Sequence, residues 1–240
     1  MTALAPAHPD FEALRERMSR LDTAAVSDAM DSLHAMDSLH AAPFMLPHIR
    51  PRTPGTVACG PAFTVRYRPV ADTAGFRNAA NYIDEVPAGS VIVVDNGGSR
   101  TCTNWGSLLS TVAQENGVAG TVVNGSVRDV REGRALGYPL FSTAVTMVSG
   151  KNRVVLDRTG VQVDIEGTVV APGDWVFADD NGALRIPASA LPEVIRRAEA
   201  VERTESRIRR AVLGGSRLDA ARARFGYARP WEDGGDDGDL

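Results

Sequence analysis

The adjacent residues Arg128 and Asp129 are the side chains best suited to chemistry. They follow the apolar stretch TVVNGSV, which predicts a buried strand that breaks at Asn124-Gly125. Adjacent side chains do not face each other, so we expect each charge to have its own partner. The arginine suits a substrate carbonyl or carboxylate, and the aspartate suits Mg²⁺ or Mn²⁺. The structural alternative is that Asp129 caps a helix beginning near Val130 and that Arg128 is solvated.

A second candidate is the glycine-rich stretch VDNGGSRTCTNWGSLL, which follows another apolar strand. A helix that starts near Gly106 leaves the backbone N–H groups of Ser107, Leu108 and Leu109 free, and such groups bind small anions. The stretch contains no G-x-G-x-x-G motif, and the chain has no P-loop lysine. We therefore expect a small carboxylate here rather than a dinucleotide or a nucleotide phosphate.

Amine chemistry is nearly excluded, because Lys151 is the only lysine among the 26 basic residues. It lies in the polar sequence SGKNR, where nothing would bury its amine, and a Schiff base needs an activated lysine. The four histidines are poorly spaced for a zinc cage, and the two cysteines form no metal or redox motif. Carbonyl chemistry in this chain would need a hard metal ion or an oxyanion site.

The elements that must position these residues alternate between strand and helix. Strands are expected at 90–94, 118–125 and 140–146, with helices at 104–117 and 129–137. This order predicts a parallel sheet in one α/β domain, with both candidate stretches at the edge where ligands bind. Further helices are expected at 10–21 and 188–213, and further strands at 56–70 and 153–187.

Composition sets broader limits, with 43% hydrophobic and 23% charged residues as in ordinary soluble domains. No apolar run is long enough for a membrane span or a signal peptide, so we expect a cytoplasmic protein with reduced Cys59 and Cys102. The tail 232–240 holds five acids and is expected to be disordered, and the remaining chain is nearly neutral, which argues against nucleic-acid binding. The hexad AMDSLH occurs twice, at 29–34 and 35–40; its aspartates are more simply read as a solvated helix face than as site acids.

Six segments occur in the order seen in the RraA-like family: VSDAMD, GPAFTV, VIVVDNGGSRTCTNWGSLL, GVAGTVVNGSVRDV, LGYPLF and PGDWVFADDNGALRIP. The chain resembles this family over about residues 20–214. The family includes 4-hydroxy-4-methyl-2-oxoglutarate / 4-carboxy-4-hydroxy-2-oxoadipate aldolases and a regulator of ribonuclease activity. The resemblance implies a swivelling β/β/α-type α/β fold with a partly parallel sheet, assembled as homotrimers or homohexamers. Residues 1–19 would then be an N-terminal helical segment and residues 215–240 a C-terminal extension.

The resemblance also implies a class II, metal-dependent pyruvate aldolase site between subunits, with Mg²⁺ or Mn²⁺. Arg128 looks like the arginine on the pyruvyl oxygen, and Asp129 like the aspartate that anchors the metal. The backbone from Gly106 through Ser107, Leu108 and Leu109 looks like the cradle of the pyruvate carboxylate. Glu205 looks like the acid lent by the neighbouring subunit, with Glu202 as the alternative.

One departure from the family is Ser107, which stands where its aldolases carry an acid. A serine cannot act as a base at neutral pH. The leading hypothesis is a lyase that cleaves a C–C bond of a pyruvyl-containing 2-oxo acid, by retro-aldol cleavage or by decarboxylation of an oxaloacetate-like substrate. Arg128 and the metal would stabilise the enolate. The alternatives are a lyase relative with a changed substrate and a non-catalytic binding protein that uses its Arg-rich helix (196–210).

Overall fold

The computed structural model describes residues 11–34, 44–70 and 80–232. The chain divides into two compact units, one formed by residues 1–11 and 42–188 and the other by residues 12–41 and 189–240. The second copy of the AMDSLH repeat, His8, His40 and the tail from Asp233 onward lie outside the described residues. The boundaries expected after residues 19 and 214 stay predictions.

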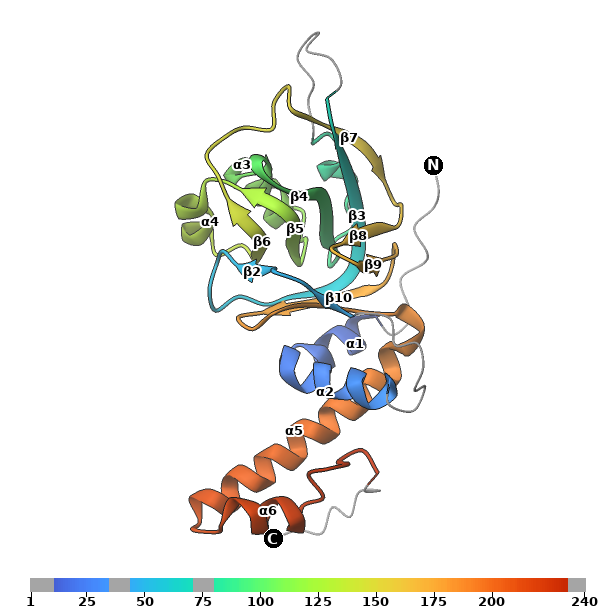
Figure 1. The fold of residues 1–240 in the computed structure, drawn as a ribbon, viewed down its shortest axis with the longest axis vertical. Coiled ribbons are helices and arrows are strands. Elements are labelled where there is room, and N and C mark those ends of the chain that lie inside the picture. Colours follow the sequence, from blue (N-terminus) through green and yellow to red (C-terminus); the bar gives the residue numbers. More distant parts are fainter. Residues whose placement is uncertain (1–10, 35–43, 71–79, 233–240) are drawn as a thin grey trace. The chain divides into compact units, whose positions relative to one another are not determined.

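Parallel strands form the centre of the first unit (Figure 1). They are β3 (Ala58–Pro69), β4 (Val91–Trp105), β5 (Gly120–Val127) and β6 (Leu140–Val145), paired in that order. The helix α3 (Ser107–Glu115) connects β4 to β5, and α4 (Val130–Leu136) connects β5 to β6. The β-α-β-α-β order predicted from the sequence is therefore confirmed, and the carboxyl ends of β4 and β5 meet at one edge of the sheet.

Antiparallel strands flank this parallel centre and complete a nine-stranded sheet in the described residues. On the β3 side lie β10 (Trp175–Asp179), β11 (Gly182–Ile186) and β1 (Met45–Leu46), and β2 (Arg50–Pro51) pairs with β6. The strand β7 (Val154–Thr159) pairs with the second half of β3. The strands β8 (Val163–Ile165) and β9 (Thr168–Val170) form a separate hairpin, and a 3-10 turn, η1 (Ile83–Glu85), precedes β4.

The two faces of β4 belong to two different hydrophobic clusters, because successive strand residues point to opposite faces. Ile92 and Val94 pack in a cluster that includes Leu109 of α3 and Val130 of α4. Val91 and Val93 pack with residues of β8, β9, β10 and β11 on the other face. Burying each such side chain contributes roughly 1.5–3 kcal/mol. The unit thus has helices on one face of the sheet and, on the other, the β8–β9 hairpin together with strands from the antiparallel end of the same sheet, which confirms the expected α/β fold class.

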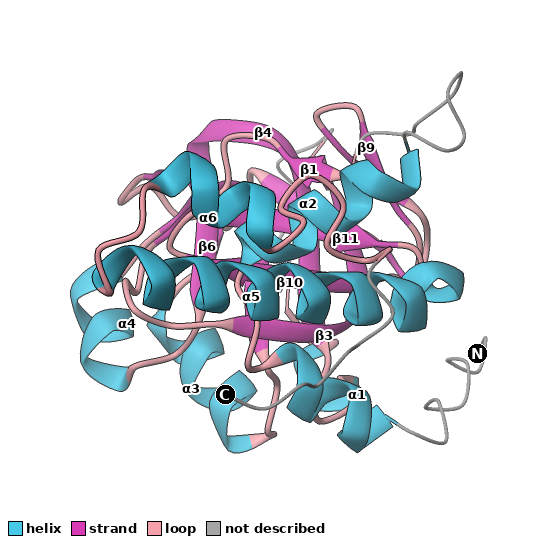
Figure 2. Ribbon diagram, turned by 90° about the horizontal axis from the view of Figure 1, so that it is seen from below, coloured by secondary structure: helices cyan, strands magenta, loops and turns pink. Residues whose placement is uncertain are grey.

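Helices make up the second unit: α1 (Phe11–Met18), α2 (Thr23–His34), α5 (Leu191–Leu213) and α6 (Leu218–Arg224), with a 3-10 turn, η2 (Ala188–Ala190), leading into α5. Figure 2 shows α5 along its length with α6 beside it. Arg197 of α5 is buried, donates to Ser32 Oγ of α2 at 2.8 Å and pairs with Glu193. Part of the Arg-rich surface of this helix is therefore internal packing. None of the described helices is long and apolar enough to cross a membrane.

The strands β4 and β5 both extend further than expected. The predicted break at Asn124-Gly125 is wrong, since β5 continues to Val127 and β4 continues to Trp105. The polar segments of the two strands pair with each other, with Asp95 opposite Asn124 and the register shifting beyond them. The Asn124 amide also donates to Asp95 Oδ1 at 3.2 Å. This cross-strand pairing satisfies backbone groups that a sequence pattern assigns to loops.

Candidate active site

A pocket of about 380 Å³ lies at the carboxyl ends of β4 and β5. It is bounded by the end of β4, the first turn of α3, the turn after β5, the segment around η1 and the turn after β6. Its polar and charged lining includes Asp84, Asn104, Arg128, Asp129 and Lys151, and Gly106 lies among them. The two stretches singled out in the sequence therefore line one pocket, as the parallel order of their strands predicts.

The turn from β5 into α4 brings the side chains of Arg128 and Asp129 together. The Arg128 N–H donates to Trp105 O at 3.0 Å, which joins the ends of β5 and β4. Asp129 then adopts a left-handed backbone, with φ 57° and ψ 37°. Its Oδ2 lies 3.5 Å from Arg128 Nε, so the expectation that the adjacent side chains do not face each other is wrong, although Asp129 also has a partner of its own in Ser107. The two side chains meet because Asp129 has a left-handed backbone conformation. Adjacent side chains point apart in a regular helix, and that geometry does not hold here.

The Asp129 carboxylate binds the first turn of α3 rather than its own helix. Its Oδ2 accepts the Ser107 N–H at 3.1 Å and the Ser107 hydroxyl at 3.3 Å. Asp129 occupies the N-cap position of α4, yet its side chain makes no capping hydrogen bond there. The helix-cap alternative therefore fails for α4. A left-handed non-glycine residue costs roughly 1–3 kcal/mol and is typical of functional sites.

The anion cradle is smaller than expected, because the Ser107 N–H is already used by Asp129. Within the part of the chain that the structure describes, the N–H groups of Leu108 and Leu109 make no hydrogen bond. Both belong to the first turn of α3, where backbone N–H groups lack partners within the helix. Two donors at a helix N-terminus remain available for a carboxylate.

Gly106 is required for this arrangement for steric reasons. A Cβ at this position would lie 2.6 Å from Asp129 Oδ2 and 3.2 Å from Arg128 Cγ and Nε. The side chains of both charged residues thus pass directly over the bare glycine backbone. Any larger residue would push one or both of them away from the start of α3.

Buried aromatic contacts hold α3 on the sheet. Trp105 is 1% exposed, donates through Nε1 to Ser110 Oγ at 3.0 Å and stacks on Tyr138. The Tyr138 hydroxyl in turn lies 2.8 Å from Thr121 Oγ1 of β5. Burial raises the pKa of Tyr138 well above its ordinary value, so the hydroxyl stays neutral. The first turn of α3 is therefore fixed relative to the end of β5.

Among the residues that line this pocket and were not identified from the sequence as site residues are Asp84, Asn104 and Lys151. Lys151 reaches the pocket because Gly150 packs tightly against β4, where a Cβ would lie 2.3 Å from Thr103 O. Asp84 is exposed on η1, and Asn104 is buried near the end of β4. The only signal in the sequence was the nearness of Asn104 to Gly106, because the contacts of the other two depend on distant segments.

The donors at the site fit a hard divalent cation that keeps most of its waters. Asp129 Oδ2 is occupied, but Oδ1 makes no hydrogen bond to any residue that the structure describes. Asp84 places a second carboxylate on the same pocket wall. Among the described residues, no three His, Cys, Asp or Glu side chains form a metal-ligand cluster. Mg²⁺ is typically bound by one or two carboxylates plus water, whereas zinc needs a fuller set of protein ligands.

Glu205, the expected acid from a neighbouring subunit, lies on α5 in the second unit. It borders a small groove of about 280 Å³ that is lined by apolar side chains, such as Ile208 and Leu213, and by Arg209 and Arg222. Its carboxylate has no hydrogen-bond partner among the described residues, whereas the Glu202 carboxylate accepts from Ser206 Oγ at 3.4 Å. Glu205 is therefore the freer of the two candidates, and its catalytic role stays a prediction.

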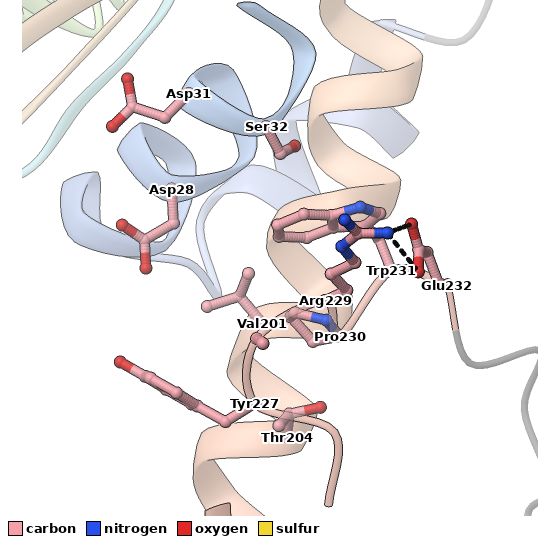
Figure 3. Close-up of a pocket in the computed structure, with 11 residues that line it drawn as sticks. Asp28, Asp31, Ser32, Val201, Thr204, Tyr227, Arg229, Pro230, Trp231 and Glu232 are labelled. Atoms are coloured by element: carbon pink, nitrogen blue, oxygen red, sulfur yellow. Dashed lines mark hydrogen bonds and ion pairs between the residues drawn. The ribbon is translucent and has the colours of Figure 1, made fainter. Parts of the chain in front are cut away.

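A larger cavity, of about 730 Å³, lies in the second unit (Figure 3). Asp28 and Asp31 of α2 border it, together with Tyr227 and Trp231. Its arginine, Arg229, pairs with Glu232 at 3.2 Å. Partial burial and the nearby carboxylates of Asp31 and Asp22 raise the pKa of Asp28. This cavity thus offers two acids on one helix face.

The RraA-like family model, described as Aldolase/RraA, matches residues 23–185, which include parts of both units. Protein DlpA of Legionella pneumophila is 42% identical over 219 residues, covering 91% of this chain but only 34% of DlpA, so the chain spans about a third of that relative's length. A Burkholderia multivorans protein with the provisional name 4-hydroxy-4-methyl-2-oxoglutarate aldolase is 33% identical, covering 70% of this chain and 99% of that protein.

A solved structure shows the same fold. Streptomyces coelicolor RraAS2, titled an unusual member of the RNase ES inhibitor RraA protein family, superposes with a TM-score of 0.71 at 29% identity. The alignment covers 83% of this chain and 96% of that one. The family match, the order of the motifs and the shared fold agree: the chain belongs to the RraA-like family.

Proposed function

We propose that this protein is a divalent-metal-dependent lyase that cleaves a C–C bond of a pyruvyl-containing 2-oxo acid. The observation that carries the proposal is that three features line one pocket: the Arg128 guanidinium, the Oδ1 of Asp129, and the N–H groups of Leu108 and Leu109. The last two features have no hydrogen-bond partner within the described part of the chain. The aldolase name of a 33% identical relative supports the same class of reaction.

The pyruvyl end of the substrate carries a carboxylate beside a carbonyl. The N–H groups of Leu108 and Leu109 would hold the carboxylate, since they offer two donors at the positive end of a helix. The Arg128 guanidinium would donate to the carbonyl oxygen, where negative charge develops during cleavage. The ion pair with Asp129 would orient the Arg128 guanidinium. Lys151 would add a second positive charge that attracts an anionic substrate.

Asp129 would hold the metal ion through Oδ1, with water completing most of the coordination. When bound, a divalent ion supplies a Lewis acid that stabilises negative charge on a substrate oxygen. Ser107 positions the aspartate by donating two hydrogen bonds to Oδ2, which leaves Oδ1 for the cation. Ser107 thus supports the metal ligand, although it cannot replace the missing acid.

In retro-aldol cleavage, the C4 hydroxyl loses its proton, the C3–C4 bond breaks, and its electron pair moves into the pyruvate enolate. Protonation at C3 then gives pyruvate, and C4 leaves as a carbonyl. In decarboxylation the same C3–C4 bond breaks, CO₂ leaves, and the same enolate is protonated. In both reactions Arg128 would stabilise the negative charge of the same pyruvate enolate. Because decarboxylation needs no base for a hydroxyl, the serine at position 107 favours it as the second candidate reaction.

Assembly belongs to the same proposal. The family suggests an oligomer, and we propose a homotrimer or a dimer of trimers in which Glu205 reaches the pocket of a neighbouring copy. The Glu205 carboxylate has no hydrogen-bond partner among the described residues, and it borders a groove that is partly apolar, as suits a subunit contact. The two cysteines are buried and are not joined in a disulfide, which suits action in the reducing cytoplasm.

The test is a screen of the purified protein against a panel of 2-oxo acids with Mg²⁺ or Mn²⁺, following pyruvate release. We expect EDTA to abolish activity and either metal to restore it. Full activity in chelator, or trapping of substrate on Lys151 by borohydride, would contradict the proposal. A protein that cleaves no member of the panel with either metal would instead favour the non-catalytic binding role.

A further inference from the structure

The side chain of Asn104 is buried in the wall of the pocket without a hydrogen-bond partner. Asn104 is 9% exposed, and neither its Oδ1 nor its Nδ2 makes a hydrogen bond within the described residues. It lies two residues before Gly106 and lines the same pocket as Arg128 and Asp129. Buried polar side chains nearly always have partners, and leaving both ends of an amide unpaired is costly.

Two explanations that do not involve a ligand are weak. Helix capping does not apply, because Gly106 occupies the N-cap position of α3. Cross-strand pairing of the side chain does not apply either, since neither amide atom has a hydrogen-bond partner on any described strand. A leucine of similar size would fill the same space without the penalty. The amide therefore points to a function in the pocket that the fold does not require.

We infer that Asn104 is a substrate-binding residue that recognises the C4 hydroxyl of the substrate; this inference rests on the proposed lyase function. The carboxylate and carbonyl of the pyruvyl end already have their partners in Leu108, Leu109 and Arg128. A hydroxyl both donates and accepts, and an amide offers both an acceptor and a donor. Both amide atoms are closed off from solvent beside the pocket, so the side chain would have to turn toward the substrate to meet its hydroxyl.

Ser107 suits this role less well, because its hydroxyl already donates to Asp129 Oδ2 and can only accept from a substrate hydroxyl. Asn104 would orient the C4 hydroxyl for deprotonation, but it is not a base, since an amide does not accept a proton at neutral pH. Its contribution is therefore specific to substrates that carry this hydroxyl. Oxaloacetate, which lacks it, should be handled by the pyruvyl half of the site alone.

The test compares Asn104→Leu with wild type on two substrates, a 4-hydroxy-2-oxo acid and oxaloacetate. We expect kcat/KM for retro-aldol cleavage to fall at least tenfold and that for decarboxylation to fall less than about threefold. We also expect the melting temperature of Asn104→Leu to equal or exceed that of wild type, because the unpaired amide is removed. Asn116→Leu is the matched control: this residue lies at the other end of α3 and donates to Ile83 O at 3.4 Å.

Equal losses on both substrates, or no loss on either, would overturn the inference about Asn104. Decarboxylation without retro-aldol activity in the wild type would also overturn it, because no C4 hydroxyl is then handled. If the wild-type protein has neither activity, the proposed lyase function is wrong. The melting temperature of Asn104→Leu then shows whether the Asn104 amide stabilises the fold. In that case an Asn104→Leu protein that melts several degrees below wild type shows a structural amide, and one that melts at or above it keeps the amide as a binding group.

Discussion

The pocket beside α3 and the cavity in the second unit differ in what holds their charged groups. The second cavity is nearly twice as large, but its acids, Asp28 and Asp31, lie on one helix face, and its arginine is neutralised by a glutamate three residues away. In the smaller pocket, Arg128 and Asp129 are held by contacts to a strand end and a helix start more than twenty residues away.

This difference shows that the size of a cavity is a poor guide to chemistry. A catalytic group must be held in place by partners that leave its reactive atom free. Asp129 meets this condition, because Ser107 occupies Oδ2 and leaves Oδ1 unpaired. The acids of the second cavity are more simply explained as a solvated helix surface. The predictions below test this contrast, beginning with the largest expected effect.

Removing Arg128 should change turnover far more than removing the arginine of the second cavity, Arg229. Arg128→Ala should lower kcat and kcat/KM about a hundredfold or more, because losing a donor to a developing oxyanion costs roughly 3 kcal/mol. Arg128→Lys should recover part of the loss, since it keeps the charge but not the planar fork. Arg229→Ala in the second cavity is the matched control and should change turnover less than about twofold. Equal activity in Arg128→Ala and wild type would make the arginine–aspartate pair structural.

The bare backbone at Gly106 should matter next. Gly106→Ala should lower kcat/KM about tenfold or more, because its Cβ would displace Asp129 Oδ2 and Arg128. The fold should survive, since flexible side chains can move aside. Gly133→Ala in α4 is the control: its Cβ meets nothing within 4 Å, and alanine should stabilise the helix by about 0.5–1 kcal/mol. Steady-state kinetics and thermal unfolding of both variants check this, and a fully active Gly106→Ala protein would contradict it.

An acid at position 107 should strengthen the metal site by a smaller factor. Ser107→Asp would place a second carboxylate beside Asp129, and two carboxylates attract a divalent cation more strongly than one. We expect the Mg²⁺ dissociation constant to fall several-fold and retro-aldol turnover to rise. Ser107→Ala is the control and should weaken Mg²⁺ binding, because Asp129 loses a hydroxyl donor. Calorimetric titration with Mg²⁺ measures both, and weaker binding in Ser107→Asp would count against a metal at Asp129.

The smallest expected effect concerns Asp28, whose pKa is raised by partial burial and by its carboxylate neighbours. A raised pKa in an acid means that the native state holds its proton longer than the unfolded chain does. Stability is then greatest below the unfolded pKa of about 3.9 and is lost as pH rises through the folded value. Asp28→Asn should therefore stabilise the protein at pH 7 by a few tenths of a kcal/mol after solvent screening, with no gain near pH 3. Urea unfolding at the two pH values tests this, and a loss of lyase activity would give the second cavity a role.

Local patterns were sufficient for the order of elements around the site. Apolar runs bounded by glycines predicted β4, β5 and β6 and the helices between them, because a buried strand and an amphipathic helix have different periods. Gly137, for example, ends α4 in a left-handed conformation, as expected for a helix terminator. The parallel connection then required the carboxyl ends of β4 and β5 to meet, which predicted one site containing Gly106, Arg128 and Asp129.

The sequence by itself determined which charged residues lie at the strand ends; only the tertiary structure decided what each of them touches. The left-handed backbone at Asp129 turns its carboxylate onto Ser107, 22 residues earlier, and away from the helix that it precedes. The close packing of Gly150 on β4 brings Lys151 to the pocket, and the burial of Asn104 leaves its amide unpaired. Such contacts depend on how distant segments close around a core, and no local period or propensity encodes that closure.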